Sequence, residues 1–310
     1  MLSVSRLVLG ATLALASHAL LADPGDKPER IRVDHETRQI EGWTVHVDTS
    51  LLEGEHKELG EQSLRYLAQR LHQIVLRIPS EPVKRMQEVP IYFDRNHPLG
   101  NAHFHPSAKW LDEHGYDPAM TKAIHITHAK SLVNEAKRRA ATSVLLHELA
   151  HAYHDRVLGF DDKAILEGYK QFCDSGNFDL VPTLGGTRRP HYGLTDHKEY
   201  FAEITETFFV GNSFYPFNHV DLLKIDPASH ALMAKIWGVD VEQLLNPKKD
   251  ALSAHDLRIL ATLNAQRGDY EEAYQWLDKA DERSPGNERF AAERKRIEEE
   301  QAKRQPSAQD

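Results

Sequence analysis

The sequence predicts an α+β fold, with a small sheet and several helices followed by a C-terminal α-helical hairpin. Three observations lead to this prediction. Stretches that alternate between apolar and polar residues occur in the N-terminal part, longer stretches with helical spacing follow, and the composition changes after Pro247. The chain has 310 residues, 40% of them hydrophobic, which is enough for one medium domain with a buried core and a smaller one.

The first residues have the pattern of an export signal. Arg6 supplies a positive charge, and residues 7–22 form an apolar run that ends in small residues. We therefore expect a signal peptide at residues 1–22 and a secreted or periplasmic mature protein without a stable membrane anchor. The alternative, a membrane anchor, needs roughly 20 apolar residues, whereas this run is shorter and is interrupted by His18.

Charge and cysteine content narrow the class of protein. A formal net charge of -9 argues against nucleic-acid binding, which normally requires a basic face. Cys173 is the only cysteine, so no intramolecular disulfide can form, and we interpret it as a small buried apolar residue. The 19 histidines favour a metal site, although they also raise the chance of accidental histidine motifs.

The expected strands lie in the first half of the chain. Residues 31–48 alternate in the manner of two strands joined by a turn, and residues 89–93, 103–110 and 123–127 are expected as further strands. Residues 56–76 carry apolar side chains at helical spacing. A long helix is expected from Asn134, acting as its cap, to Leu158, where Gly159 ends it.

The next region is rich in glycine and proline. Residues 161–192 predict a surface loop with a short helix inside. Thr195 is expected to cap a helix that runs to Phe209, and Ser229 to cap a helix that ends at Trp237. We place the first domain at residues 23–246.

Residues 247–303 are expected to form a helical segment, with helices at residues 252–266 and 270–283 and a third from Asn287. Gly268, Tyr270, Ala273 and Pro285 make this segment similar to a tetratricopeptide repeat. Only about one and a half repeats fit, so either a hairpin docked on the first domain or a module that binds a protein partner is compatible with the pattern. Residues 304–310 are expected to be a disordered tail.

The strongest chemical signal is the run His147-Glu148-Leu149-Ala150-His151. Residues four apart lie on the same face of a helix, so both imidazoles can reach one metal ion. Glu148 lies beside the first histidine, where it can accept a proton from metal-bound water. This pattern predicts a zinc site with hydrolytic chemistry.

A catalytic zinc needs three protein ligands and one open position. One known pattern requires glycine at position 154 and histidine at position 157, where this chain has His154 and Val157. The third ligand can instead be a carboxylate on a later helix. Glu199 and Glu203 lie one turn apart in an otherwise largely apolar stretch, so one can bind the metal while the other hydrogen-bonds to a ligand histidine.

These residues together resemble the catalytic domain of the anthrax lethal factor-like zinc metallopeptidases. The resemblance is carried by HELAHAYH at residues 147–154 and YGLTDHKEYFAE at residues 192–203. It covers residues 141–211 closely and residues 31–246 more loosely, and it leaves out the C-terminal helices. The resemblance implies a zincin-like domain with an active-site helix, a Zn²⁺ cofactor and the following roles: metal ligands His147, His151 and Glu199; general base Glu148; oxyanion-stabilising phenol Tyr192; and Glu203 behind a ligand histidine.

We therefore predict a zinc-dependent metalloendopeptidase in which Glu148 activates water for attack on a peptide or protein substrate. One alternative is a zinc amidase acting on cell-wall peptides, because the same ligands serve either reaction. Another is a catalytically inactive peptidase-fold protein that binds a partner through its C-terminal helices. Glu148 and Tyr192 argue against the inactive protein, since a binding scaffold needs no general base.

Several other polar residues lie near the motif or on the expected strands. His154 either contacts the metal or its ligands or packs in the core. Arg188 and Arg189 either bind an acidic group of the substrate or lie solvated in their loop. A substrate strand is expected to pair with a sheet edge between His103 and Thr127. Four histidines are interpreted as core or surface residues, because three ligands are already supplied: His103, His105, His125 and His128.

Overall fold

The computed structural model describes residues 30–137, 142–241 and 253–304. The predicted signal peptide at residues 1–22, both sides of the predicted boundary at residues 246 and 247, and residues 305–310 lie outside the described residues. The chain divides into two compact units, one ending at Leu232 and the other beginning at Met233. Helices and a small sheet are both present, which confirms the predicted mixture of the two.

A five-stranded sheet lies in the first unit. Its strands follow the order β1-β2-β3-β5-β4, with β2, β3 and β5 parallel and the outer strands β1 and β4 antiparallel to their neighbours. Successive side chains of a strand point to opposite faces, and in β2 the alternate residues Trp43, Val45 and Val47 are fully buried. One face of β2 therefore packs into the core. The strands of this sheet are β1 His35–Ile40, β2 Trp43–Asp48, β3 Ile91–Phe93, β4 His103–Phe104 and β5 Ile124–Ile126.

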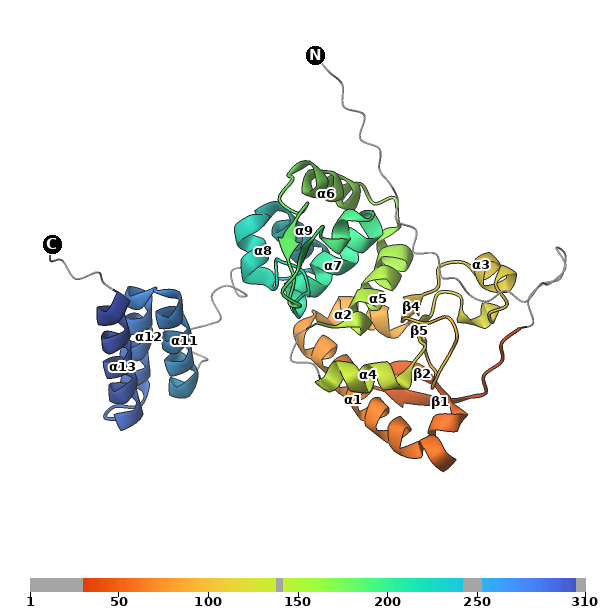
Figure 1. Ribbon diagram of the computed structural model, residues 1–310, viewed down its shortest axis with the longest axis horizontal. Helices are drawn as coiled ribbons and strands as arrows, with labels where there is room; N and C mark the ends of the chain where they lie inside the picture. The colour runs from red at the N-terminus through yellow and green to blue at the C-terminus, as the bar shows by residue number, and fades with distance from the viewer. Residues whose placement is uncertain (1–29, 138–141, 242–252, 305–310) are drawn as a thin grey trace, which may run out of the picture. The chain divides into compact units, whose positions relative to one another are not determined.

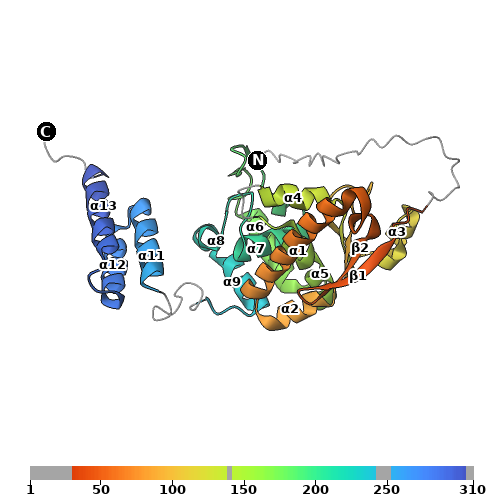
Figure 2. The ribbon, with the colours of Figure 1, turned by 90° about the horizontal axis from the view of Figure 1, so that it is seen from below.

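The helices of the first unit lie on both sides of α5: α1 to α4 lie near the sheet, and α6 to α9 gather on the side of α5 away from it (Figure 1). In two views α1 and α4 pack side by side, while α5 packs against both β4 and α7 (Figures 1 and 2). None of the helices in the described ranges combines the length and apolarity needed to cross a bilayer. The α-helices before the C-terminal segment are α1 Lys57–Arg77, α2 Ser80–Gln87, α3 Ala108–Glu113, α4 Ala129–Lys137, α5 Val144–Tyr153, α6 Lys163–Asp174, α7 His197–Phe209, α8 His219–Ile225 and α9 Pro227–Trp237.

Short elements connect these helices and strands. Residues 161–192, expected to be a loop with a short helix, contain the twelve-residue α6 and a small antiparallel hairpin. The short elements are the 3₁₀ turns η1 Thr49–Leu51, η2 Gly54–His56, η3 Pro118–Met120 and η5 Tyr192–Leu194, the π-helix η4 His154–Leu158, and the strands β6 Val181–Pro182 and β7 Arg188–Arg189.

The single helix predicted from Asn134 to Leu158 is wrong. Residues 142 and 143 are not helical, and α5 begins only after Ser143, whose hydroxyl accepts a hydrogen bond from Leu146 N at 3.2 Å. The backbone N–H of Ser143 donates to Glu206 Oε1 at 2.5 Å. Since Glu206 belongs to α7, a tertiary contact sets where α5 starts, and local sequence spacing does not reveal such a contact.

Other predicted ends are also corrected. The residue that caps α7 is Asp196 and not Thr195. The Asp196 carboxylate accepts hydrogen bonds from two backbone groups, Lys198 N and Glu199 N, whereas a threonine hydroxyl would cap through a single one. The helix ending at Trp237 starts at Pro227 instead of after Ser229. The strand expected at residues 103–110 ends at Phe104, and the later part of that range begins α3.

Three helices form the core of the second unit: α11 Ala254–Arg267, α12 Tyr270–Arg283 and α13 Glu288–Arg304. Gly268 ends α11 in the left-handed conformation, at φ 90°, which glycine adopts without steric cost. The helix α13 continues to Arg304, so the disordered tail predicted to begin at that residue is corrected there. The buried residues shared by the three helices are Leu257, Ala261, Ala265, Ala273, Leu277, Ala280, Phe290 and Ile297.

Candidate metal centre

Two helices of the first unit bring the predicted ligands together. The apolar residues Leu145, Leu146 and Leu149 of α5 are buried, which fixes the rotation of that helix. His147 and His151 then project from one face of α5 toward Glu199, in the first turn of α7. The packing of α5 on α7 therefore determines the position of this three-residue cluster, which we call the helical cluster.

The three ligand atoms of the helical cluster form a small triangle. His147 Nε2 lies 3.1 Å from Glu199 Oε2 and 3.1 Å from His151 Nε2, and the third side, from His151 Nε2 to Glu199 Oε2, is 3.5 Å. Ligand atoms about 2.0–2.1 Å from a tetrahedral zinc are separated by about 3.3–3.4 Å. The triangle therefore fits three corners of a zinc tetrahedron.

A second carboxylate fixes the orientation of the first histidine. His147 Nδ1 lies 3.3 Å from Glu203 Oε1 and 3.7 Å from Glu206 Oε2. Asn212 Nδ2 in turn donates to Glu203 Oε2 at 2.9 Å. An imidazole whose Nδ1–H donates to a carboxylate presents an unprotonated Nε2 to a metal, and Glu203 lies where it can accept that hydrogen bond from His147.

The electrostatics of the helical cluster favour a cation. Burial alone would raise the pKa of Glu199, but hydrogen bonds with His147 and His151 lower it to about 2. Burial also opposes a charged imidazole, yet hydrogen bonds to Glu199, Glu203 and Glu206 raise the pKa of His147 well above its ordinary value. The carboxylates thus stabilise positive charge at this position, and a divalent ion supplies that charge when it binds. Charge, donor types and separations all fit zinc.

Glu148 lies between the helical cluster and the sheet edge. It is buried, and its Oε2 accepts a hydrogen bond from Phe104 N of β4 at 2.8 Å. This N–H is therefore occupied by Glu148, which limits the pairing of a substrate strand with β4. The backbone of the edge strand holds the Glu148 carboxylate in one orientation beside His147.

Tyr192 lies in η5, before α7. Its ring centroid is 6.5 Å from that of His147, and 46% of the side chain is exposed. Burial and the charge of Glu199 raise the pKa of the phenol, so the hydroxyl is protonated and able to donate at neutral pH. The preceding residue, His191, is buried and accepts from Gly193 N at 3.0 Å, which shapes the turn that carries Tyr192.

The remaining residues singled out in the sequence lie outside this cluster. His154 is fully buried, packs against Phe160 and Phe201, and neither of its ring nitrogens has a hydrogen-bond partner. It therefore packs in the core and is no ligand. Arg188 donates to Leu180 O, and Arg189 lies over the ring of Phe214. Cys173 is half-buried in α6.

Sequence reasoning missed several residues near the two histidine-rich parts of the first unit. Glu206 contacts His147, and its signal was its spacing of seven residues from Glu199, two helical turns along the same face. Asp94 and His97 form a second group with His125. Their signal was a carboxylate placed immediately after the strand that ends at Phe93.

The chain matches no protein-family model, no curated protein and no solved structure in comparisons with all three. The resemblance to the lethal factor-like peptidases and the zincin-like fold therefore stay predictions, carried by the residues quoted above. The helical cluster and its surroundings are the basis for assigning a function.

Proposed function

We propose that this protein is a zinc-dependent metalloendopeptidase. The observation that carries the proposal is the helical cluster, in which two imidazole nitrogens and a carboxylate oxygen lie 3.1–3.5 Å apart. Glu148, a base, lies in α5 next to His147, and Tyr192, a phenol, lies in η5 just before α7. Secretion or periplasmic location, a peptide or protein substrate, and partner binding by the C-terminal helices belong to the same proposal.

His147, His151 and Glu199 would hold the ion. A bound zinc ion supplies Lewis acidity toward a carbonyl group and lowers the pKa of a water molecule to about 7. Glu203 keeps the Nδ1 proton of His147 in place, which leaves Nε2 free to bind. Three protein ligands would leave one position of a tetrahedral ion open, as hydrolytic zinc sites require.

The other residues handle protons and charge. Glu148 accepts the proton of the attacking water and later donates it to the leaving amine, with its carboxylate oriented by Phe104 N. Tyr192 donates a hydrogen bond from its protonated hydroxyl to the oxygen that becomes negative as the carbonyl is attacked. Exposure of Tyr192 leaves this group accessible to a substrate from solvent.

Digestion of a diverse peptide mixture by the zinc-loaded protein tests the proposal. The matched variant is Glu148→Gln, which preserves shape and leaves the three ligands intact. We expect new peptide termini with the wild type and a roughly 10²–10⁴-fold slower reaction with the variant at equal zinc content. Glu167→Gln, which changes an exposed carboxylate on α6, is the control and should digest like the wild type.

Two outcomes would overturn the proposal. If wild type and Glu148→Gln both hold one zinc ion at the helical cluster and neither cuts any peptide, peptide hydrolysis is excluded. A parallel assay on cell-wall peptides then decides between the amidase and the inactive binding protein. If both proteins digest peptides at equal rates, Glu148 is not the base.

A further inference from the structure

A second histidine-rich group lies in the sheet of the first unit. Asp94 follows β3, His97 follows shortly after it, and His125 lies in the middle of β5. One ligand atom from each lies within 4.8 Å of the others. All three side chains are buried, with exposures of 1%, 2% and 0%. We call these residues the sheet cluster.

Buried charge needs compensation, which this cluster obtains in an ordered way. Asp94 Oδ2 lies 2.8 Å from His125 Nε2, and Asp94 Oδ1 lies 2.7 Å from His35 Nε2. The ring centroids of His97 and His125 are 4.6 Å apart, edge to face. A carboxylate and two imidazoles thus converge on one small volume.

The partners outside the cluster have the arrangement that surrounds metal ligands. His125 Nδ1 lies 3.4 Å from His105 Nε2, so His125 can donate through Nδ1 while Nε2 faces the centre. Likewise, Asp94 accepts from His35 with one oxygen and keeps the other for the centre. Leu99 N lies 3.3 Å from His97 Nδ1, a long hydrogen bond that His97 can exchange for a metal ion.

We propose that Asp94, His97 and His125 bind a second divalent transition-metal ion, with zinc as its expected identity. The two imidazoles and one carboxylate form a donor set that suits zinc. The ion would be structural, because its three ligands are only 0–2% exposed and a substrate from solvent cannot reach it. The proposal is independent of the peptidase function.

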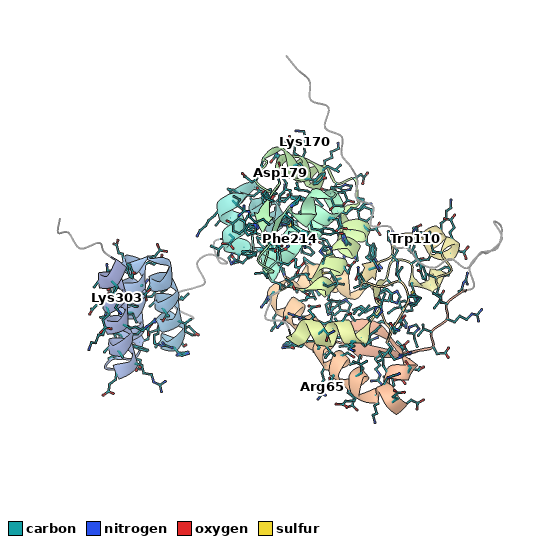
Figure 3. The ribbon with its side chains drawn as sticks, in the orientation of Figure 1. Arg65, Trp110, Lys170, Asp179, Phe214 and Lys303 are labelled. Carbon is teal, nitrogen blue, oxygen red and sulfur yellow. The ribbon has the colours of Figure 1, made fainter. Side chains whose placement is uncertain are left out.

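The sheet cluster also connects to the helical cluster through β4. His105, which contacts His125, directly follows Phe104, whose N–H holds Glu148. Figure 3 labels Trp110 on α3. The ring of Trp110 lies nearly parallel to that of His105, with 6.5 Å between the ring centroids. A metal in the sheet cluster would therefore hold the strand that orients the general base.

Metal titration of the full-length mature chain tests the second site. The protein is stripped with a chelator and titrated with zinc in competition with a chromophoric chelator, and bound metal is counted by atomic emission. We expect two tightly bound zinc ions in the wild type and one in the His147→Ala variant. That variant removes the one histidine common to both ligand groups on α5 and α7, and it leaves the sheet cluster intact.

The double variant His147→Ala with His97→Ala should bind none, and Trp110 offers a second signal. In the His147→Ala background, Co²⁺ should quench tryptophan fluorescence, and Trp110→Phe should remove most of that quenching. One zinc ion in the wild type and none in His147→Ala would overturn the proposal. The sheet cluster would then be a metal-free hydrogen-bonded network. This result would leave the peptidase proposal untouched, since peptide digestion is measured separately.

Discussion

The helical cluster and the sheet cluster contain the same kinds of donor atoms, two imidazoles and one carboxylate. They differ in exposure and in their neighbours. The side chains of His147, His151 and Glu199 are 12%, 14% and 21% exposed, whereas those of the sheet cluster are almost wholly buried. A hydrolytic metal needs an open position and a base, and a structural metal needs neither. The comparison teaches that the same set of donor atoms can serve different chemistry, because solvent access and neighbouring groups differ between the two clusters.

The largest expected effect comes from removing a ligand of the helical cluster. His151→Ala should lower the peptidase rate by about 10³-fold or more, because the Lewis acidity of zinc is worth several kcal/mol in the transition state. Peptide cleavage and zinc content are measured together. The exposed His255→Ala on α11 is the matched control and should keep both. Full activity in the His151→Ala variant would contradict the assignment of the helical cluster as the catalytic one.

Removal of the phenol should have the next largest effect. Tyr192→Phe should lower kcat by about 10²–10³-fold with little change in KM, because the hydrogen bond strengthens only as the oxyanion forms. Steady-state kinetics on one cleaved peptide measure both values. Tyr274→Phe, in the C-terminal helices, is the control. A rise in KM alone would assign Tyr192 to substrate binding and remove it from the chemistry.

The carboxylate behind His147 should affect metal affinity. Glu203→Gln should weaken zinc binding by about 10–100-fold, because the variant amide holds the Nδ1 proton of His147 less strongly. Glu206→Gln is the matched comparison. Burial raises the pKa of Glu206, and its distance from His147 Nδ1 is longer, so a smaller loss is expected. Equal losses in the two variants would show that total charge, and not the single contact, sets the affinity.

His154 differs from the histidines of both clusters, because it is buried and its ring nitrogens have no hydrogen-bond partner. Burial lowers the pKa of His154 from 6.5 to about 4. Between these pH values His154 binds a proton more readily in the unfolded chain than in the folded one. The free energy of unfolding is therefore undiminished by His154 above about pH 6.5, and it decreases as the pH falls toward about 4.

The free energy of unfolding of the wild type should thus fall by about 2 kcal/mol more than that of His154→Phe between pH 7.5 and pH 5. Urea unfolding of both proteins at a series of pH values measures this difference. Parallel pH dependences in the two proteins would mean that His154 gains a partner in solution and is charged when folded.

Local spacing predicted the parts of the fold that depend on single segments. The helix at residues 56–76 and the strand pair at residues 31–48 follow from periodicity, and the end of α7 at Phe209 follows from Gly211 and Asn212 just after it; the structure confirms all three. The start of α5 and the cap of α7 depend instead on particular hydrogen bonds, those of Ser143 N and of the Asp196 carboxylate. The backbone N–H of Ser143 donates to the carboxylate of Glu206, which is 63 residues away. Periodicity within one segment cannot predict such a contact.

The two clusters show the same limit. The pair His147 and His151 could be predicted because four-residue spacing places both on one helix face. Asp94, His97 and His125 come together only through the parallel pairing of β3 with β5, where Tyr92 is opposite His125. Without strand order and register, His125 alone was interpreted as an ordinary core or surface histidine. Sheet topology was the missing information.

Crystals of the zinc-loaded protein, with diffraction data collected above and below the zinc absorption edge, provide the most direct measurement. We expect an anomalous peak about 2 Å from His147 Nε2, His151 Nε2 and Glu199 Oε2, with a solvent-accessible fourth position. A second peak is expected at Asp94, His97 and His125. Absence of the first peak in crystals that contain zinc would contradict the central claim that the helical cluster holds a catalytic metal.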